Sequence, residues 1–366
     1  MSEWKEYFLR DAVELITGFP FKGDKYEMKG KLKVVRGENV TLGTLRWDSE
    51  KYWNHSIENL EKYFLKTDDI VIGMDGSRVG QNRAIIRENE LPLILAQRVA
   101  RLRAKKNFDQ KFIWYQIYSK RFMDYVDAIQ TGTSIPHISP SLINDFNISA
   151  PDIKEQKIIT ETISSLDGKI DLLHRQNKTL EQLGEALFRQ DTMESEKVGR
   201  LGDVMDLVYG KTMKEETRTG NGFPVVGSSG IVGYHSDYLV EGPGIVIGRK
   251  GTLGKVIYLF ENFFPIDTTY FVKSKNNSIG LFYEYFLLKT MNFLEMNSDS
   301  AVPGLNRDIA LSTEIKILPQ HIISEFNNQC LTLFQKIKTN TNQIRTLTQL
   351  RDTLLPKLMS GEVRVS

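Results

Sequence analysis

Two stretches with the same rhythm decide the fold: residues 159–187, ITETISSLDGKIDLLHRQNKTLEQLGEAL, and residues 326–354, FNNQCLTLFQKIKTNTNQIRTLTQLRDTL. In both, the seam positions follow at alternating intervals of four and three residues, which is the a/d pattern of a coiled-coil helix. The two patterns match position by position from their first seam residue to their last. The seam positions are Ile159, Ile163, Leu166, Ile170, Leu173, Asn177, Leu180, Gly184 and Leu187 in the first, and Phe326, Cys330, Leu333, Ile337, Asn340, Ile344, Leu347, Arg351 and Leu354 in the second.

Each pattern predicts a helix of about 30–35 residues, or about 45–50 Å at 1.5 Å per residue. Pro151 and Pro319 precede the patterns, and Pro356 and Gly361 are expected to end the second helix. The helices could each pack on a domain of their own, or they could pair. The matched register and the length favour pairing, because a lone helix of this length would leave much of its apolar stripe in water.

The two seam asparagines distinguish the possible pairings. If the helices run antiparallel with residue numbers summing to 517, Asn177 lies opposite Asn340 and Leu173 lies opposite Ile344. A parallel pairing of the two matched patterns would set each asparagine against an apolar side chain and leave its amide poorly hydrogen-bonded. We therefore predict an intramolecular antiparallel coiled coil.

The rest of the chain also repeats once. Three short motifs recur in the same order, at residues 9–11 and 201–203, 70–76 and 245–251, and 135–138 and 302–305. The separation between the two copies shrinks along the chain, because the first copy has longer loops. This pattern predicts two related globular domains, at 1–150 and 193–318, each followed by one of the helical segments, at 151–192 and 319–366.

Short β-rich runs alternate with turns inside both globular parts, so we expect the α+β class. The expected strands are Lys31–Val35, Ile70–Gly73, Ala84–Arg87, Val225–Gly227, Gly244–Gly248, Lys255–Phe260 and Thr269–Val272. One helix per copy is expected as well, at Lys111–Ile129 and Gly280–Met296.

Composition limits the functional classes. The 366 residues hold 48 Lys+Arg against 46 Asp+Glu, a net charge of +2, which argues against nucleic-acid binding by bulk electrostatics alone. Residues 1–150 carry 23 basic and 20 acidic groups and residues 151–366 carry 25 and 26. No apolar run reaches the ~18–20 residues of a membrane span, and the N-terminus is charged, so we expect a cytoplasmic protein. A single cysteine excludes an intramolecular disulfide framework.

Two glycine-rich loops, residues 73–80 and 248–255, are candidates for binding DNA. The second ends in Gly-Lys like a phosphate-binding P-loop, but it lacks the required glycine at Arg249 and the hydroxyl residue at Val256. A tight hairpin explains the glycines. Their exposed hydroxyl and basic residues are of the types that contact phosphates and base edges, namely Ser77, Arg78, Arg249, Lys250 and Thr252.

Further candidate DNA contacts lie outside these loops. Arg101 and Arg103 alternate with Leu102, so on a strand they would share one face and could meet a phosphate backbone, with Arg98, Lys105 and Lys106 close by in the sequence. A solvated face or a plain turn would explain such residues equally well. The remaining candidates are Thr133, Ser134, His137, Ser228, Ser229 and Arg307.

The sequence shows no recognisable catalytic or metal-binding pattern. The five histidines are scattered, and none has the H-E-x-x-H spacing of a zinc site. Asp68, Asp69 and Asp75 suggest a nuclease cluster, but Lys250 stands where Asp75 would recur, so no metal site is repeated. Cys330 lies on the apolar stripe and is expected to serve packing.

Several of these segments resemble the specificity (S) subunit of type I restriction–modification systems. Residues 151–159, PDIKEQKII, are close to the P-x-x-E-Q-x-x-I opening of that family's first long helix, and residues 354–365, LLPKLMSGEVRV, are similar to its C-terminal signature. Trp4-Lys5, Gly132-Thr133 with Pro136, and the loops with Gly76 and Gly251 fit as well. Residues 319–324, PQHIIS, depart from the family pattern because the Glu-Gln pair is missing.

The resemblance implies two target-recognition domains, each reading one half of a bipartite sequence in double-stranded DNA, with the helices as a spacer of set length. It also implies two methyltransferase (M) subunits docked on the helices, and restriction (R) subunits in the complex. S-adenosylmethionine, ATP and Mg²⁺ would be used by those partners, so no cofactor, metal or catalytic residue is expected in this chain. Two alternatives stay open: a DNA-acting enzyme with an unrecognised site, and a coiled-coil scaffold that does not read DNA.

Overall fold

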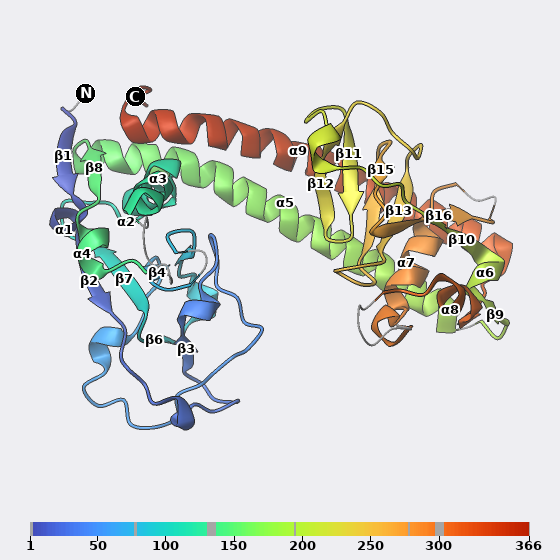
Figure 1. Ribbon diagram of the computed structural model, residues 1–366, viewed down its shortest axis with the longest axis horizontal. Coiled ribbons are helices and arrows are strands. Elements are labelled where there is room, and N and C mark those ends of the chain that lie inside the picture. Colours follow the sequence, from blue (N-terminus) through green and yellow to red (C-terminus); the bar gives the residue numbers. More distant parts are fainter. Residues whose placement is uncertain are drawn as a thin grey trace. The chain divides into compact units, whose positions relative to one another are not determined.

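The computed structural model describes residues 3–76, 79–129, 137–193, 195–276, 279–296 and 304–365. The chain forms two compact units, residues 1–169 with 346–366, and residues 170–345. The boundaries between the units fall inside two long helices, α5 (Ile153–Met193) and α9 (Gln320–Ser360), so each unit holds a part of both helices (Figure 1). No helix among the described residues has the length and apolar character that a membrane span requires.

The first unit is built on an antiparallel sheet with the strand order β2-β7-β4-β5. Two smaller pairs accompany it, the antiparallel β1-β8 and the parallel β3-β6. Its elements before α5 are β1 (Lys5–Phe8), α1 (Leu9–Ala12), β2 (Val13–Thr17), β3 (Lys33–Val35), β4 (Ile70–Gly73), β5 (Arg83–Ile85), β6 (Leu93–Leu95), β7 (Val99–Ala104), α2 (Gln110–Tyr118), α3 (Lys120–Ile129), α4 (Pro140–Asn144) and β8 (Asn147–Ala150).

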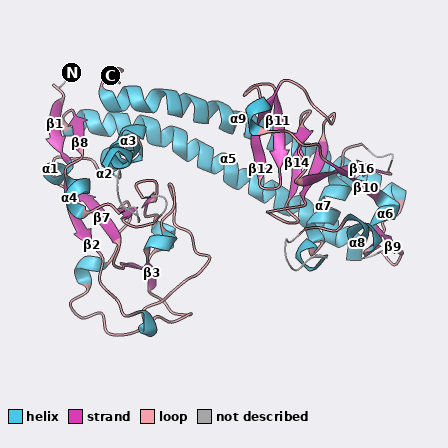
Figure 2. Ribbon diagram, viewed as in Figure 1, coloured by secondary structure: helices cyan, strands magenta, loops and turns pink. Residues whose placement is uncertain are grey.

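The second unit repeats this plan with the sheet order β10-β16-β13-β14 (Figure 2). It has the pair β9-β17 and a three-stranded sheet, β12-β11-β15. Its elements are β9 (Val198–Arg200), α6 (Leu201–Val204), β10 (Met205–Tyr209), β11 (Phe223–Gly227), β12 (Gly230–His235), β13 (Gly244–Gly248), β14 (Val256–Leu259), β15 (Phe264–Pro265), β16 (Thr269–Ser274), α7 (Phe282–Thr290), α8 (Arg307–Ser312) and β17 (Glu314–Lys316). The predicted α+β class and internal repeat are therefore confirmed, and β4 and β13 have the predicted bounds.

The prediction of one continuous helix over Lys111–Ile129 was wrong, because the chain breaks at Ser119 into α2 and α3. The Ser119 hydroxyl donates to the carbonyl of Gln116 at 2.7 Å, and its oxygen accepts from the Phe122 N–H at 3.4 Å. One side chain thus ends the first helix and begins the next. In the second unit, the expected helix Gly280–Met296 is also shorter: α7 ends at Thr290, and a 3₁₀ turn follows at Phe293–Met296.

Both long helices extend over 41 residues, more than the expected 30–35. Pro356 was expected to help end α9, but the helix continues through it to Ser360. The buried side chains of Leu355, Leu358 and Met359 belong to the core of the first unit and offset the hydrogen bond that a proline removes. Gly361, with φ +76°, ends the helix as predicted.

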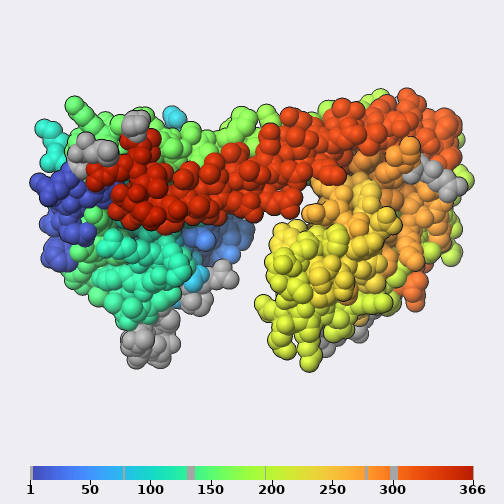
Figure 3. Space-filling model, turned by 90° about the horizontal axis from the view of Figure 1, so that it is seen from above, coloured from blue at the N-terminus to red at the C-terminus, as the bar shows by residue number. Residues whose placement is uncertain are grey.

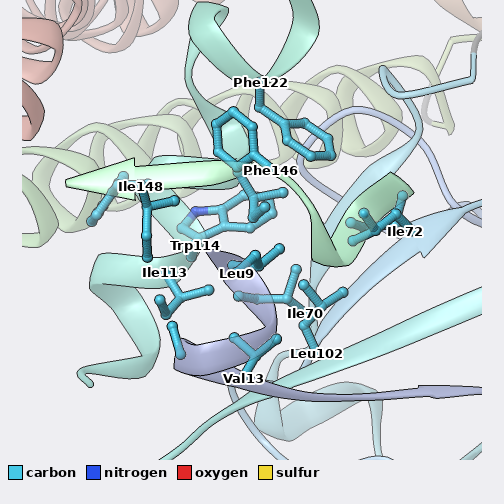
Figure 4. Close-up of a cluster of buried hydrophobic side chains, with 14 of the residues drawn as sticks. Leu9, Val13, Ile70, Ile72, Leu102, Ile113, Trp114, Phe122, Phe146 and Ile148 are labelled. Atoms are coloured by element: carbon cyan, nitrogen blue, oxygen red, sulfur yellow. The ribbon is translucent and has the colours of Figure 1, made fainter. Parts of the chain in front are cut away.

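The core of the first unit lies between the sheet and the helices α2 and α3 (Figure 4). Leu9, Ile70, Leu102 and Phe122 are fully buried there. Alternate residues of β4 and β7 supply the strand side chains, and α3 contributes Phe122 and Val126, one turn apart. Helix α2 is buried without a break from Phe112 to Ile117.

Candidate nucleic-acid interface

The loop after β4 holds a charged cluster in the first unit. The Ile138 N–H donates to the carbonyl of Met74 at 2.9 Å, which fixes the start of this loop against the segment that begins at His137. The Asp75 carboxylate contacts the His137 ring and lies 3.2 Å from the Nε of Arg98. Arg98 has the unusual φ of +67°, and 71% of its side chain is exposed. A carboxylate thus orients an exposed guanidinium group directly before β7, an inner strand of the sheet.

A cavity of about 390 Å³ adjoins this cluster. The Arg36 guanidinium lies 5.7 Å from the ring centroid of Tyr26, and its Nη2 donates to the carbonyl of Ser49 at 2.7 Å. Burial raises the pKa of the Tyr26 hydroxyl above its ordinary value. The cavity is lined by Phe21, Gly23, Tyr26, Arg36, Gly37, Glu38, Asp75, Gly76, Ala96, Gln97 and Arg98. It therefore offers both hydrogen-bond donors and aromatic surface to a ligand.

The equivalent loop of the second unit holds an arginine by different means. The Leu305 N–H donates to the carbonyl of Arg249 at 2.9 Å, the same anchoring contact as in the first unit. The Arg249 guanidinium carbon lies 4.9 Å from the ring centroid of Tyr209 and 5.8 Å from that of Tyr270. Its Nη1 donates to the carbonyl of Asp267 at 2.9 Å. Cation–π contacts and this hydrogen bond together restrict the guanidinium plane.

The turn between β11 and β12 lies against the glycine-rich loop of the second unit. Lys255 Nζ donates to the carbonyl of Ser229 at 2.6 Å. A Cβ atom added to Gly251, which has φ +79°, would lie 3.3 Å from Ser228 Oγ. The structure therefore brings the predicted residues Ser228 and Ser229 to the loop that carries Arg249, although β12 and β13 separate the two loops in the sequence.

Three other predicted contacts lie in or near this loop. Lys250 and Thr252 are exposed. A single β-bridge joins Lys250 to Gly304, and the equivalent bridge in the first unit joins Asp75 to His137. Arg307 is the first residue of α8, and its Nε is buried without a hydrogen-bond partner among the described residues.

Arg101 does not have the exposure that its predicted phosphate contact requires. It lies on β7 and is 2% exposed, with its guanidinium Nη2 2.7 Å from Glu14 Oε2. Arg103 shares that strand and donates to both carboxylate oxygens of Asp69, at 2.8 and 2.6 Å. The prediction was wrong for Arg101 because β2 and β4 flank this strand on both sides, and Glu14 of β2 supplies a carboxylate to its guanidinium group.

Four predicted residues lie outside the described parts of the chain: Ser77, Arg78, Thr133 and Ser134. Their role in DNA binding stays a prediction. Within the described residues, no group of three or more His, Cys, Asp or Glu side chains is placed to hold a metal ion.

The residues that orient Arg98 and Arg249 were not predicted from the sequence. Tyr209 and Asp267 belong to other segments of the chain than Arg249 and have no motif of their own. Asp75 was considered only as a possible metal ligand. The single available signal was the recurrence of the segments at 135–138 and 302–305, which does reflect a shared packing position beside the two loops.

The predicted asparagine pairing is present in the second unit. Asn340 is fully buried, and its Nδ2 donates to Asn177 Oδ1 at 2.9 Å. Asn177 Nδ2 in turn lies 3.3 Å from Thr341 Oγ1. Together with the hydrogen bond from Arg351 to Asp167 in the first unit, this contact shows the predicted antiparallel register, in which Asn177 lies opposite Asn340.

Burial along the helices follows the predicted seam. Cys330 is fully buried, which raises the pKa of its thiol to about 12. Gly184 lies against Phe286, where an added Cβ would come within 2.5 Å of the ring. Buried seam residues are Ile159, Ile163, Leu173, Gly184, Phe326, Cys330 and Asn340. Half-buried ones are Leu166, Ile170, Asn177, Leu180, Leu187, Leu333, Ile337, Ile344, Leu347, Arg351 and Leu354.

A buried tyrosine fastens each globular part to α5. Tyr115 of α2 donates to Asp167 Oδ2 at 2.8 Å, and Asp167 Oδ1 also accepts from Arg351 Nη1 at 3.0 Å. In the second unit, Tyr285 of α7 donates to Glu181. Burial raises the pKa of both phenols.

Comparisons with known proteins agree with this repeat. The family model described as "Type I restriction modification DNA specificity domain" matches residues 1–182 and 193–349. The chain is 24% identical over 318 residues to the type I restriction enzyme MjaIX specificity subunit of Methanocaldococcus jannaschii, covering 75% of this chain and 74% of that protein. It is 22% identical to the HindI specificity subunit of Haemophilus influenzae, covering 99% of this chain and all of that protein.

Two further comparisons concern length and fold. The chain is 26% identical over 187 residues to the MjaVIII specificity subunit of M. jannaschii, a match that spans only 43% of that subunit's length. The crystal structure of the type I restriction-modification S subunit from M. genitalium superposes with a TM-score of 0.63 at 21% identity, covering 98% of this chain and 96% of that one. The latter likeness shows that the two proteins share a fold.

Proposed function

The chain belongs to the type I restriction modification DNA specificity family, and from this premise we propose that it is the DNA-recognition subunit of a type I restriction–modification complex. The observation that carries the proposal is an oriented arginine beside the repeated loop of each unit: Arg98, just before β7, lies beside the loop after β4, and Arg249 belongs to the loop after β13. Arginine is the side chain most often used for specific contacts with bases. Two such loops in one chain suit a target with two half-sites.

Each globular part then reads one half of a bipartite sequence in double-stranded DNA. Arg98 and His137 in the first unit, and Ser228, Arg249 and Lys250 in the second, are the contacts best supported by their positions. Because the net charge is only +2, we expect the chain alone to bind DNA weakly and its partners to supply additional positive surface.

The long helices serve as spacer and as docking surface for methyltransferase subunits. Leu183 and Leu350 stand at equivalent positions of the two matched helix patterns and are 49% and 45% exposed. Apolar side chains exposed at equivalent positions suit two copies of one partner. In the space-filling view, one face of α9 lies uncovered on the visible side of the second unit (Figure 3).

Catalysis belongs to the partner subunits in this proposal. Methyltransferase and restriction subunits would use S-adenosylmethionine, ATP and Mg²⁺, and this chain would supply the sequence recognition. A DNA-acting enzyme and a scaffold that does not read DNA are the two competing functions.

Co-expression with the methyltransferase subunit, followed by base-resolution mapping of methylated DNA, tests the proposal. The expected result is methylation at one two-part sequence, lost when this chain is omitted. Methylation with no sequence preference would favour the scaffold. DNA cleavage or methylation by the isolated chain would favour the enzyme.

A further inference from the structure

Both units place one arginine at the same backbone hydrogen bond of the fold. In the first unit the arginine supplies the carbonyl acceptor, and in the second unit it supplies the N–H donor. In the first unit the Met74 N–H donates to the carbonyl of Arg98 at 2.9 Å. In the second unit the Arg249 N–H donates to the carbonyl of Thr268, also at 2.9 Å. The strand registers of β4 with β7 and of β13 with β16 show that the two bonds are equivalent. Arg98 therefore corresponds to Thr268, and Arg249 corresponds to Met74.

The residue that orients the arginine also differs between the two units. Arg98 is oriented by Asp75, at 3.2 Å. The residue equivalent to Asp75 in the second unit is Lys250, which would repel a guanidinium group. An arginine at the position of Thr268 would have no such partner there.

The two tyrosine rings that support Arg249 are likewise replaced at the equivalent positions of the first unit. Arg249 lies over Tyr209 and Tyr270, which face each other across β10 and β16. The equivalent residues across β2 and β7 are Thr17 and Ala100. An arginine at the position of Met74 would therefore find no ring at these two positions.

Each unit thus keeps one oriented guanidinium group beside its loop while the source and the support of that group differ. Arg98 also adopts a left-handed backbone conformation, φ +67°, which costs free energy for a residue other than glycine. Orientation matters most where a planar donor pair must match two acceptors, as in the contact of arginine with guanine O6 and N7. A contact to a phosphate needs the charge but tolerates many orientations.

We propose that Arg98 and Arg249 are the specificity-determining side chains of the two units, each reading a guanine in its own half-site. The inference rests on the proposed function and adds to it the two residues and the base that they recognise. Asp75, Tyr209 and the carbonyl of Asp267 act as positioning groups.

The test compares charge-conserving and charge-removing variants in the chain assembled with methyltransferase subunits. Arg98→Lys and Arg249→Lys keep a positive charge but lose the paired donors, whereas the two alanine variants lose both. Arg87→Ala and Lys273→Ala remove exposed basic residues elsewhere in the same units and serve as controls. Binding is measured to the mapped target and to duplexes with single base-pair changes.

Arg249→Lys should reduce discrimination at one guanine of one half-site by about 5- to 150-fold, which corresponds to about 1–3 kcal/mol. Discrimination in the other half-site should not change. Arg98→Lys should have the reciprocal effect, and the controls should leave all positions unchanged.

Two results would overturn the inference while leaving the proposed function intact. Either lysine variant could keep full discrimination, which would assign a phosphate contact, or the affected base pair could contain no guanine. If the wild-type complex itself bound all duplexes equally, the proposed function would fail first.

Discussion

Replacing Asn177 by Leu should loosen the paired helices of the second unit, and replacing Asn340 as well should restore them. Asn340 is fully buried, and its Nδ2 donates to Asn177 Oδ1 at 2.9 Å. Asn177→Leu removes this acceptor and leaves a buried amide with a lost hydrogen bond, which costs about 1–3 kcal/mol. The double variant replaces the whole polar pair by leucines on the a/d seam, so its helices should be at least as stable as those of the wild type.

Hydrogen exchange measured by mass spectrometry would report this local stability. Peptides from residues 170–187 and 330–347 should exchange about 5- to 150-fold faster in Asn177→Leu, since exchange reports the free energy of local opening. Lys178→Leu is the matched control, because it adds a leucine at an exposed position beside the seam.

Comparison of the double variant with the two single variants tests whether the Asn177–Asn340 pair stabilises this register. Asn340→Leu alone should also accelerate exchange, because it removes the donor to Asn177 Oδ1. Two results would show that the asparagine pair does not stabilise this register. Asn177→Leu could leave the exchange rate unchanged, or the increase in exchange rate in the double variant could equal the combined increases of the two single variants.

Three further outcomes follow from buried positions. Because burial raises the pKa of Cys330 to about 12, iodoacetamide should alkylate it at pH 8 only in unfolded chains. The protonated thiol also contributes to the stability of the fold below about pH 8.5, the pKa of a free thiol, and this contribution is lost as the pH rises toward 12. Rapid alkylation of the native chain would contradict this. Gly80→Ala should destabilise the first unit by about 1–3 kcal/mol in urea unfolding, since Gly80 has φ +78° and the added Cβ would lie 2.5 Å from Val126 Cγ1; an unchanged midpoint would count against it. Asp69→Asn should cost about 1–3 kcal/mol in the same measurement, because it weakens the two hydrogen bonds from Arg103, and equal stability would show that the pair contributes nothing.

Much of the candidate site depended on contacts that local sequence does not reveal. Arg101 and Arg98 both belong to the basic run near β7, yet one is buried against Glu14 and the other is exposed beside Asp75. Only the neighbouring strands decide which arginine finds its carboxylate inside the sheet. The loop of the second unit was predicted, but its tyrosine platform was not, because Tyr209 reaches Arg249 through the register of separate strands.

The sequence by itself determined the repeat, the two heptad stripes and the register that pairs Asn177 with Asn340. Periodicity along the helices encodes the stripes and the register, since the a/d spacing defines a face and one polar position on it defines the alignment. The tertiary structure alone decided which arginine each unit presents and what orients it. Those contacts join side chains from different strands and loops, and strand pairing, rather than spacing in the sequence, brings them together.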